Sequence, residues 1–217
     1  MASMLSKLAR LWKWRRQVRA ALGSLTSLYE GDGVADALGG LTAEETAGLV
    51  SWLPASGTVV EFGTLFGLTT VELARRSAPD VKVVTVDIFC WNPFGLPPEK
   101  HEAFTRRILA PWTESGKVTL VKSDSKAFRD QMAAAAGAPI KQSSNADNPT
   151  IPQMVFLDAD HSYEAVRDEI AWAKSFGVKT ICGHDYGNPL FGVTRAVDEA
   201  FPGGVETAGM CWKGNIV

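Results

Sequence analysis

One short segment carries the main prediction about the fold of this chain: Glu61-Phe62-Gly63-Thr64-Leu65-Phe66-Gly67-Leu68-Thr69. A β-branched run, Thr58–Phe62, leads directly into it, and a helix-length amphipathic stretch follows at once. Gly63 permits a tight turn and a close backbone approach, while Gly67 and Thr69 open a helix whose first amides attract a carboxylate. The segment therefore predicts a strand, a glycine loop and a helix that together bind a ligand.

A second acid follows at the distance that nucleotide-binding folds use. Asp87 closes the next β-like run, twenty residues after Gly67, where a carboxylate accepts hydrogen bonds from both hydroxyls of a ribose. The spacing E-x-G-x-x-x-G differs from the G-x-G-x-x-G of dinucleotide loops, because Glu61 would repel a pyrophosphate but suit a cationic ligand. An ordinary βα turn with a buried acid is the alternative.

Short apolar runs alternate with amphipathic stretches along the rest of the chain. The predicted strands are 58–62, 81–86, 118–121, 154–157 and 178–182, followed by two short β-like pieces at 205–207 and 211–217. The predicted helices are about 68–77, 99–109, 126–136, 163–176 and 193–201, and the capping box Thr42-Ala43-Glu44-Glu45 starts another that ends near Pro54. This pattern predicts an α/β fold, with a doubly wound, seven-stranded, mostly parallel sheet, N-terminal helices and a C-terminal antiparallel hairpin.

The charge is unevenly distributed. The 217 residues carry a formal net charge of −2, which argues against a dedicated nucleic-acid binder. Residues 1–29 hold six cations and no acid, so the remaining chain has 16 cations against 24 acids, a charge of −8. We predict two parts, a basic N-terminal helix and linker over 1–40 and one globular domain over 41–217.

The N-terminal part predicts one amphipathic helix. Its apolar stripe comprises Met4, Leu8, Leu11, Val18, Leu22 and Leu25. Such a helix docks on the domain or on a second subunit, and a membrane surface is the less expected alternative. The three cysteines form no C-x-x-C pair, and no apolar run reaches the length of a membrane span, so we expect a reduced cytoplasmic protein.

The glycine loop and its acids resemble those of class I S-adenosylmethionine-dependent methyltransferases, and the resemblance covers roughly residues 41–217. It implies that four residues surround the methionine part of the cofactor: Glu61, Gly63, Thr64 and Gly67. It also implies that Asp87 holds the ribose and that Asp124 and Ser125 lie near the adenine. For Asp124 and Ser125 a helix cap is an alternative compatible with cofactor contact.

A second group of polar residues follows the fourth and fifth predicted strands. Asp158 lies at the end of one and Asp185 at the end of the next, so the two carboxylates converge beside the predicted cofactor pocket. Paired carboxylates without an adjacent Lys or Arg attract a hard divalent cation, for which Mg²⁺ is the natural choice. Capping of the following helices is the alternative.

The segments D-x-D-H-S-Y-E and G-H-D-Y resemble the metal-dependent small-molecule O-methyltransferase branch that includes macrocin-type and cephalosporin hydroxylase-like proteins. The resemblance implies that Asp158, His184 and Asp185 bind the metal, although His184 departs from the acids and amides of relatives, which makes Asp160 the substitute. It also implies that His161 accepts the proton; orienting a neighbouring carboxylate is the alternative.

The sequence thus predicts an S-adenosylmethionine-dependent O-methyltransferase that uses Mg²⁺ or another divalent cation and acts on a hydroxyl of a sugar, phenol or similar metabolite. The alternatives are a hydroxylase-like or repurposed member of the branch, or a non-catalytic cofactor-binding or membrane-associated module. The expected partners are a small-molecule acceptor and a second copy of the chain, without nucleic acid. Two apolar segments, 88–98 and 188–191, are candidates for the acceptor-binding walls, or they merely cover the sheet.

Overall fold

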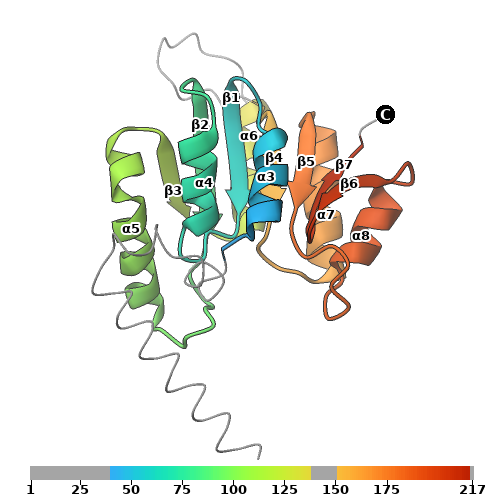
Figure 1. Ribbon diagram of the computed structural model, residues 1–217. Helices are drawn as coiled ribbons and strands as arrows, with labels where there is room; N and C mark the ends of the chain where they lie inside the picture. The colour runs from blue at the N-terminus through green and yellow to red at the C-terminus, as the bar shows by residue number, and fades with distance from the viewer. Residues whose placement is uncertain (1–39, 138–150, 216–217) are drawn as a thin grey trace, which may run out of the picture.

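The computed structural model describes residues 40–137 and 151–215 as one seven-stranded sheet with helices on both faces (Figure 1). The strand order is β3-β2-β1-β4-β5-β7-β6. The strands are β1 (Gly57–Phe62), β2 (Val81–Asp87), β3 (Val118–Lys122), β4 (Met154–Leu157), β5 (Thr180–Gly183), β6 (Val205–Ala208) and β7 (Cys211–Gly214). The first five strands are parallel and β7 runs antiparallel between β5 and β6. The predicted doubly wound sheet and its C-terminal hairpin are confirmed.

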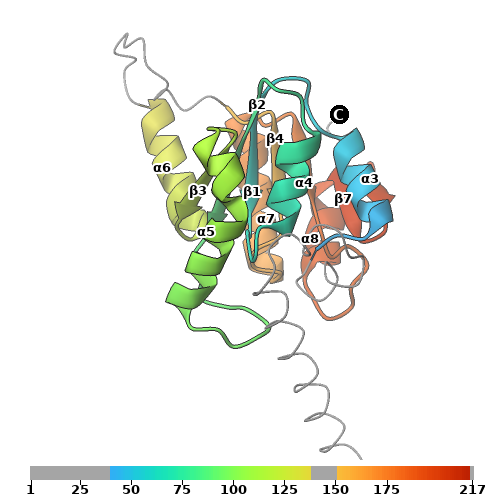
Figure 2. The ribbon, with the colours of Figure 1, turned by 60° about the vertical axis from the view of Figure 1, so that its left-hand side comes forward.

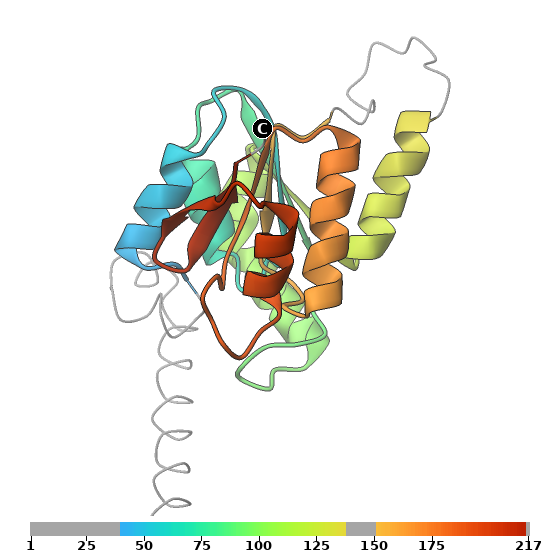
Figure 3. The same ribbon diagram turned by 90° about the vertical axis from the view of Figure 1, so that its right-hand side faces the viewer.

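The helices divide between the two faces of the sheet. They are α3 (Ala43–Ser51), α4 (Leu68–Arg76), α5 (Pro98–Glu114), α6 (Ser125–Gly137), α7 (Tyr163–Phe176) and α8 (Val193–Ala200). α3, α4 and α5 cover one face, while α6, α7 and α8 cover the other (Figure 1 and Figure 3). Figure 2 shows α4 and α5 side by side in front of the sheet. The predicted capping box is present, since Thr42 and Glu45 each bond the other's backbone amide.

Each face has its own hydrophobic core. Alternate residues of β1 point to opposite sides, so Val59 packs in the core under α4 and α5 while Val60 packs in the core under α7 and α8. The four residues of β4 are all buried, as expected of a central parallel strand. This two-sided burial fixes the register of β1 and β4, and thereby the positions of the residues that follow them.

Two helix ends differ from the sequence prediction by several residues. α3 ends at Ser51, before the predicted end near Pro54. α5 continues to Glu114, past the predicted end at Leu109, although Pro111 lies inside it. Trp112 packs against the same core as Phe104 and Ile108, so tertiary packing of this face outweighs the hydrogen bond that proline removes.

One sequence prediction, the basic amphipathic helix of residues 1–29, lies outside the described residues. The division at residue 40 therefore stays a prediction. Among the helices that the structure describes, none has the length and apolarity that a bilayer crossing requires.

The strand order reverses at β1, whose neighbours are β2 and β4. In open α/β sheets ligands bind at such a switch point, outside the carboxyl ends of the strands. The glycine loop after β1 and the polar segments after β4 and β5 all lie at that edge.

Candidate functional site

The glycine loop packs directly against the end of β4. Gly63 has φ of +92°, and a Cβ placed on it would lie 2.0 Å from the carbonyl oxygen of Asp158. No L side chain fits this approach, which explains the glycine without reference to a ligand. Gly67 has φ of +84° and precedes the first turn of α4. The two predicted glycine positions thus shape the loop and hold it next to the predicted metal site.

Leu65 lies in the left-handed region, with φ of +47°, and is held from both sides. Its amide donates to Oδ2 of Asp87 at 2.8 Å. Its carbonyl faces Nε2 of His101 at 2.8 Å and accepts from the hydroxyl of Thr105 at 2.6 Å. Such strain persists only where the surroundings fix it, and it is common at binding sites. Sequence reasoning missed His101 and Thr105 because only the packing of α5 brings them to this loop.

Asp87 secures the loop through backbone amides. It accepts hydrogen bonds from Thr64 at 3.0 Å, from Leu65 at 2.8 Å and from Phe89 at 2.6 Å. A carboxylate offers about four acceptor positions, so one remains for a ligand hydroxyl. Asp87 is half-buried at the carboxyl edge, which is compatible with the predicted contact to a ribose.

Glu61 and Thr64 direct their side chains into the interior. Glu61 is fully buried, and its Oε2 accepts from the hydroxyl of Thr70 at 2.5 Å while Oε1 has no partner. Burial raises the pKa of Glu61 to about 8, against the hydrogen bonds from Thr70 and Thr85 that lower it. The hydroxyl of Thr64 bonds that of Thr85 at 2.6 Å. Glu61 therefore joins β1 to α4 as a neutral acid, and its contact with a cofactor stays a prediction.

The residues predicted near an adenine begin α6. Oδ1 of Asp124 accepts from the amide of Ala127 at 2.7 Å, which is the geometry of a helix cap. Asp124 is exposed and Ser125 is half-buried. The capping alternative is thus present, and it leaves a second oxygen of Asp124 free to meet a ligand.

The acids after β4 and β5 converge, as the parallel topology predicts. Asp158, His184 and Asp185 each offer a ligand atom, and these atoms lie within 4.8 Å of one another. Nδ1 of His184 is 3.7 Å from Oδ1 of Asp158 and 3.6 Å from Oδ2 of Asp185. Two carboxylates and one imidazole nitrogen facing a common point form a suitable donor set for a divalent cation.

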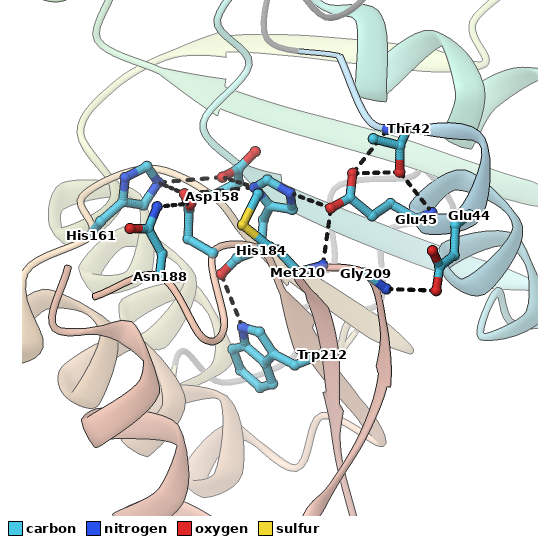
Figure 4. A network of polar contacts seen from close by, with 11 residues as sticks. Thr42, Glu44, Glu45, Asp158, His161, His184, Asn188, Gly209, Met210 and Trp212 are labelled. Carbon is cyan, nitrogen blue, oxygen red and sulfur yellow. Dashed lines mark hydrogen bonds and ion pairs between the residues drawn. The ribbon is translucent and has the colours of Figure 1, made fainter. Parts of the chain in front are cut away.

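His161 lies on the other side of the same two carboxylates. Its Nε2 is 3.3 Å from Oδ1 of Asp158 and 3.4 Å from Oδ2 of Asp185, and Figure 4 shows Asp158 between the two imidazole rings. Burial lowers the pKa of His161, but the hydrogen bond to Asp158 and the charges of both acids outweigh it, so the pKa lies above its ordinary value. The two carboxylates therefore favour the protonated form of the His161 imidazole.

His184 is fixed by groups from three elements. Its amide donates to the carbonyl of Leu157 at the end of β4. Its carbonyl accepts from Nε1 of Trp212 on β7 at 3.2 Å. Its Nε2 lies 3.2 Å from Oε1 of Glu45 on α3. Although burial lowers it, the pKa of His184 rises to about 9 because Asp185, Asp158 and Glu45 surround the ring.

Glu45 is the main site residue that sequence reasoning missed. The capping box predicted its place in the first turn of α3. This local role gave no indication of its contact with His184, which is 139 positions away in the sequence. It is 3% exposed. Its burial raises the pKa, but backbone hydrogen bonds from Thr42 and Met210, with the charge of His184, hold the pKa below its ordinary value.

Asp185 is also held in one orientation. Its backbone has φ of +61°, and its Oδ1 accepts from the side-chain amide of Asn188 at 2.9 Å, so Oδ2 faces the two histidines. Its hydrogen bonds and the histidine charges outweigh burial and lower its pKa. Asp160 is exposed, and its Oδ1 accepts from the amide of Ser162. It therefore does not join the group formed by Asp158, His184 and Asp185.

Apolar side chains border the polar group. Phe191 lies with its ring centroid 4.6 Å from that of His161, and it is 40% exposed. Leu190 beside it is 84% exposed, and Trp91 in the β2–α5 connection is 68% exposed. Asn188, Pro189 and Phe191 line a surface hollow together with residues of α8. Both predicted wall segments thus expose apolar side chains, and Phe191 lies beside the polar group.

Comparisons with known proteins bear on the fold. No protein-family model matches the chain, and no protein of curated function matches it. The O-methyltransferase TomG of Streptomyces achromogenes, involved in tomaymycin synthesis and solved with S-adenosylmethionine, has a TM-score of 0.52 at 19% identity, over 81% of this chain and 80% of that one. An O-methyltransferase of Bacillus cereus with S-adenosylhomocysteine has a TM-score of 0.46 at 17% identity, over 83% and 93%. The first likeness shows that this chain has the Rossmann-like methyltransferase fold.

Proposed function

We propose that the chain transfers a methyl group from S-adenosylmethionine to a hydroxyl of a small molecule, with a divalent cation held by Asp158, His184 and Asp185. The observation that carries this proposal is the convergence of these three residues with His161 at the carboxyl edge of β4 and β5, next to the glycine loop of β1. The resemblance of the sequence to methyltransferases and the fold shared with TomG support it.

The cofactor part of the proposal places S-adenosylmethionine over the loop 63–67. Asp87 retains one acceptor position for a ribose hydroxyl, and Asp124 retains a free oxygen at the end of β3. The bound sulfonium would lie near the acids after β4, which suits its positive charge. We expect Glu61 to act indirectly, by fixing the loop.

The donor set fits a divalent cation. Asp158 and Asp185 present one oxygen each, and Nδ1 of His184 lies less than 4 Å from both. When bound, the cation would acidify an acceptor hydroxyl by acting as a Lewis acid. Asn188 and Glu45 hold the orientations of Asp185 and His184. Such outer partners determine where the ligand atoms point.

His161 is the proposed general base. Its Nε2 faces the carboxylate pair from the side opposite His184, and the Phe191 ring packs against its imidazole. A base must lie within hydrogen-bond reach of the hydroxyl that it deprotonates. The expected acceptor reaches the carboxylate pair with a hydroxyl and places its body against the exposed apolar side chains of residues 188–191.

Calorimetry with S-adenosylmethionine, with and without Mg²⁺ or Mn²⁺, tests the cofactor claim. We expect saturable binding in both conditions. Absence of binding in both would refute the methyltransferase proposal. Detection of S-adenosylhomocysteine in a screen of sugars, phenols and other hydroxylated metabolites would then identify the acceptor class.

The metal claim is tested by replacing single acids. We expect Asp158→Ala and Asp185→Ala to lose divalent-metal binding by at least tenfold and metal-dependent turnover with it, while cofactor affinity stays the same, because each removes one ligand oxygen. Asp160→Ala is the matched comparison, because Asp160 lies two residues from Asp158 and bonds only the amide of Ser162 among the described contacts. Loss of metal binding in Asp160→Ala, with retention in the other two, would contradict this ligand set.

A second candidate function is an oxidation that uses iron. The observation that favours it is the presence of two imidazoles beside two carboxylates, since non-haem iron sites combine such ligands. Saturable Fe²⁺ binding in a protein that shows no affinity for S-adenosylmethionine would favour this candidate over methyl transfer.

A further inference from the structure

A buried carboxylate from outside the strand-end cluster contacts His184. Glu45 lies in the first turn of α3, and its side chain passes between α3 and the β6–β7 turn (Figure 4). Its Oε2 accepts from the amide and hydroxyl of Thr42, both at 2.9 Å. Its Oε1 accepts from the amide of Met210 at 3.0 Å and lies 3.2 Å from Nε2 of His184. Three hydrogen bonds therefore hold this carboxylate in place independently of its contact with His184.

The contact with Glu45 determines which nitrogen of His184 carries a proton. A carboxylate held by three donors accepts further hydrogen bonds but offers none, so Nε2 of the ring must carry the hydrogen. The other nitrogen, Nδ1, then has a lone pair in the neutral ring. Nδ1 is the atom that faces Asp158 at 3.7 Å and Asp185 at 3.6 Å.

We propose that Glu45 is a positioning residue that presents Nδ1 of His184 to a divalent transition-metal ion bound between Asp158 and Asp185. Metal-binding histidines donate their second ring N–H to a carboxylate or carbonyl, which sets the tautomer and raises the basicity of the ligand atom. Here the carboxylate comes from a helix that precedes β1, 139 residues from the histidine in sequence. The inference rests on the proposed metal site and adds to it a determinant of affinity and a class of ion.

The class of ion follows from the ligand atoms. An imidazole ligand suits Fe²⁺, Co²⁺ or Zn²⁺, whereas Mg²⁺ prefers oxygen ligands and keeps several waters. A carboxylate bonded to Nε2 increases this difference, because it strengthens the nitrogen donor. The expected order of affinity is thus Co²⁺ above Mg²⁺, in contrast to the Mg²⁺ expected from the sequence.

The experiment measures Co²⁺ and Mg²⁺ binding to the full chain by calorimetry and by the visible absorption of bound Co²⁺. The test variant is Glu45→Gln, which a capping box tolerates. The matched control is Glu44→Gln, because Glu44 lies in the same helical turn and also accepts an amide of the β6–β7 turn, that of Gly209 at 3.3 Å, but does not contact His184. We expect Glu45→Gln to weaken Co²⁺ binding about 10- to 100-fold, and Glu44→Gln to leave it unchanged.

A second control compares helix capping with ligand orientation. Thr42→Ala removes the cap of α3 and the hydroxyl that bonds Oε2 of Glu45, but it keeps the Glu45 carboxylate and the amides of Thr42 and Met210 that hold it. It should therefore lower the melting temperature and weaken Co²⁺ binding much less than Glu45→Gln does. Should Glu45→Gln fail to fold, the wild-type protein still decides: in the Co²⁺ complex, a histidine bound through Nδ1 shows a shifted, solvent-exchangeable Nε2 proton by NMR.

The outcomes distinguish this inference from the proposed function. Equal Co²⁺ affinity of the wild type and Glu45→Gln, equal losses in Glu44→Gln and Glu45→Gln, ligation through Nε2, or tighter binding of Mg²⁺ than of Co²⁺ would each overturn the positioning role or the class of ion and leave the metal site intact. Absence of any divalent binding to the wild type would overturn the metal site as well.

Discussion

Glu61 links β1 to α4 from a fully buried position, and this burial favours its uncharged form. It is fully buried, it receives a hydrogen bond from Thr70, and no basic side chain compensates it among its described contacts. Burial therefore raises its pKa to about 8 from an ordinary 4.5. Glu61, the acid expected to attract a cationic ligand, is therefore largely neutral at pH 7.

The pH dependence of stability follows from this shift. Below pH 4.5 both the folded and the unfolded chain keep the proton of Glu61; between 4.5 and 8 only the folded chain does, so stability falls as pH rises. One proton contributes at most about 1.4 kcal/mol per pH unit. We expect Glu61→Gln to remove this contribution in urea unfolding measured from pH 5 to pH 9.

The control for this prediction is Glu72→Gln, on the exposed side of α4, where Glu72 pairs with Arg76. Its pH profile should keep the wild-type slope. Glu169, whose burial raises its pKa to about 7, adds a slope of the same sign, so only the difference between the wild type and Glu61→Gln reports on Glu61. Parallel profiles of these two proteins would contradict the assignment.

Among the residues of the candidate site, the sequence predicts the ones that the order of the parallel strands brings together. Asp158 and Asp185 were predicted to converge because they follow neighbouring parallel strands, and they do. Glu45 and His101 were not, because each reaches the site through helix packing, over 139 and 36 residues of sequence. No local pattern in the chain encodes such contacts.

The elements around the switch point depend on close contact between the loop of β1 and the end of β4. Gly63 requires both a left-handed backbone and an absent Cβ, whereas Gly177, the C-cap of α7, requires only the backbone conformation, since nothing lies within 4 Å of its Cβ position. Comparing the two separates strain from steric overlap.

We expect Gly177→Ala to cost about 1–2 kcal/mol of unfolding free energy, the usual cost of a left-handed alanine. Gly63→Ala should cost more, at least about 3 kcal/mol, because the added methyl group overlaps the backbone of Asp158 at 2.0 Å. It should also weaken metal binding, since Asp158 must move. Chemical denaturation of both variants measures the difference, and equal losses would show that the loop adapts.

At the scale of elements, apolar patterning predicts that a strand or helix is present more reliably than it predicts where that element ends. β1, β2 and β4 are recognisable because most of their residues are buried, which gives short and mainly apolar runs; in β2 only Lys82 is exposed. The C-terminal end of α5 is not, because Pro111 indicates a stop that the packing of Trp112 overrides. Helix ends are set by such tertiary contacts, which the local sequence does not encode.

For the whole molecule, the described residues, 40–137 and 151–215, already assemble two cores and the candidate site. The residues named for cofactor, metal and proton transfer all belong to this part, and so do the two clusters of apolar side chains on the faces of the sheet. The sequence assigns the six cations of residues 1–29 to a helix outside this domain. Folding and chemistry should therefore be separable from that segment.

Deletion of residues 1–39 tests this separation. We expect the truncated chain to keep its melting temperature and its affinity for Co²⁺ and S-adenosylmethionine. If the apolar stripe of the predicted helix docks between subunits, the deletion should also change the sedimentation coefficient beyond the loss of mass. Loss of folding would show that residues 1–39 complete the domain. Unaltered assembly together with lost binding to anionic liposomes would favour the membrane alternative.

A charge variant of the full chain separates docking through the apolar stripe of that predicted helix from electrostatic attraction through its cations. Arg15→Gln, Arg16→Gln and Arg19→Gln together remove half of its cations and leave the apolar stripe intact. Docking between subunits depends on the stripe, so assembly should persist in this variant, whereas attraction to an anionic surface depends on the cations and would weaken by about 1 kcal/mol for each one removed. Dissociation of the triple variant would instead indicate that the remaining chain, residues 30–217 with a charge of −8, binds the helix through charge.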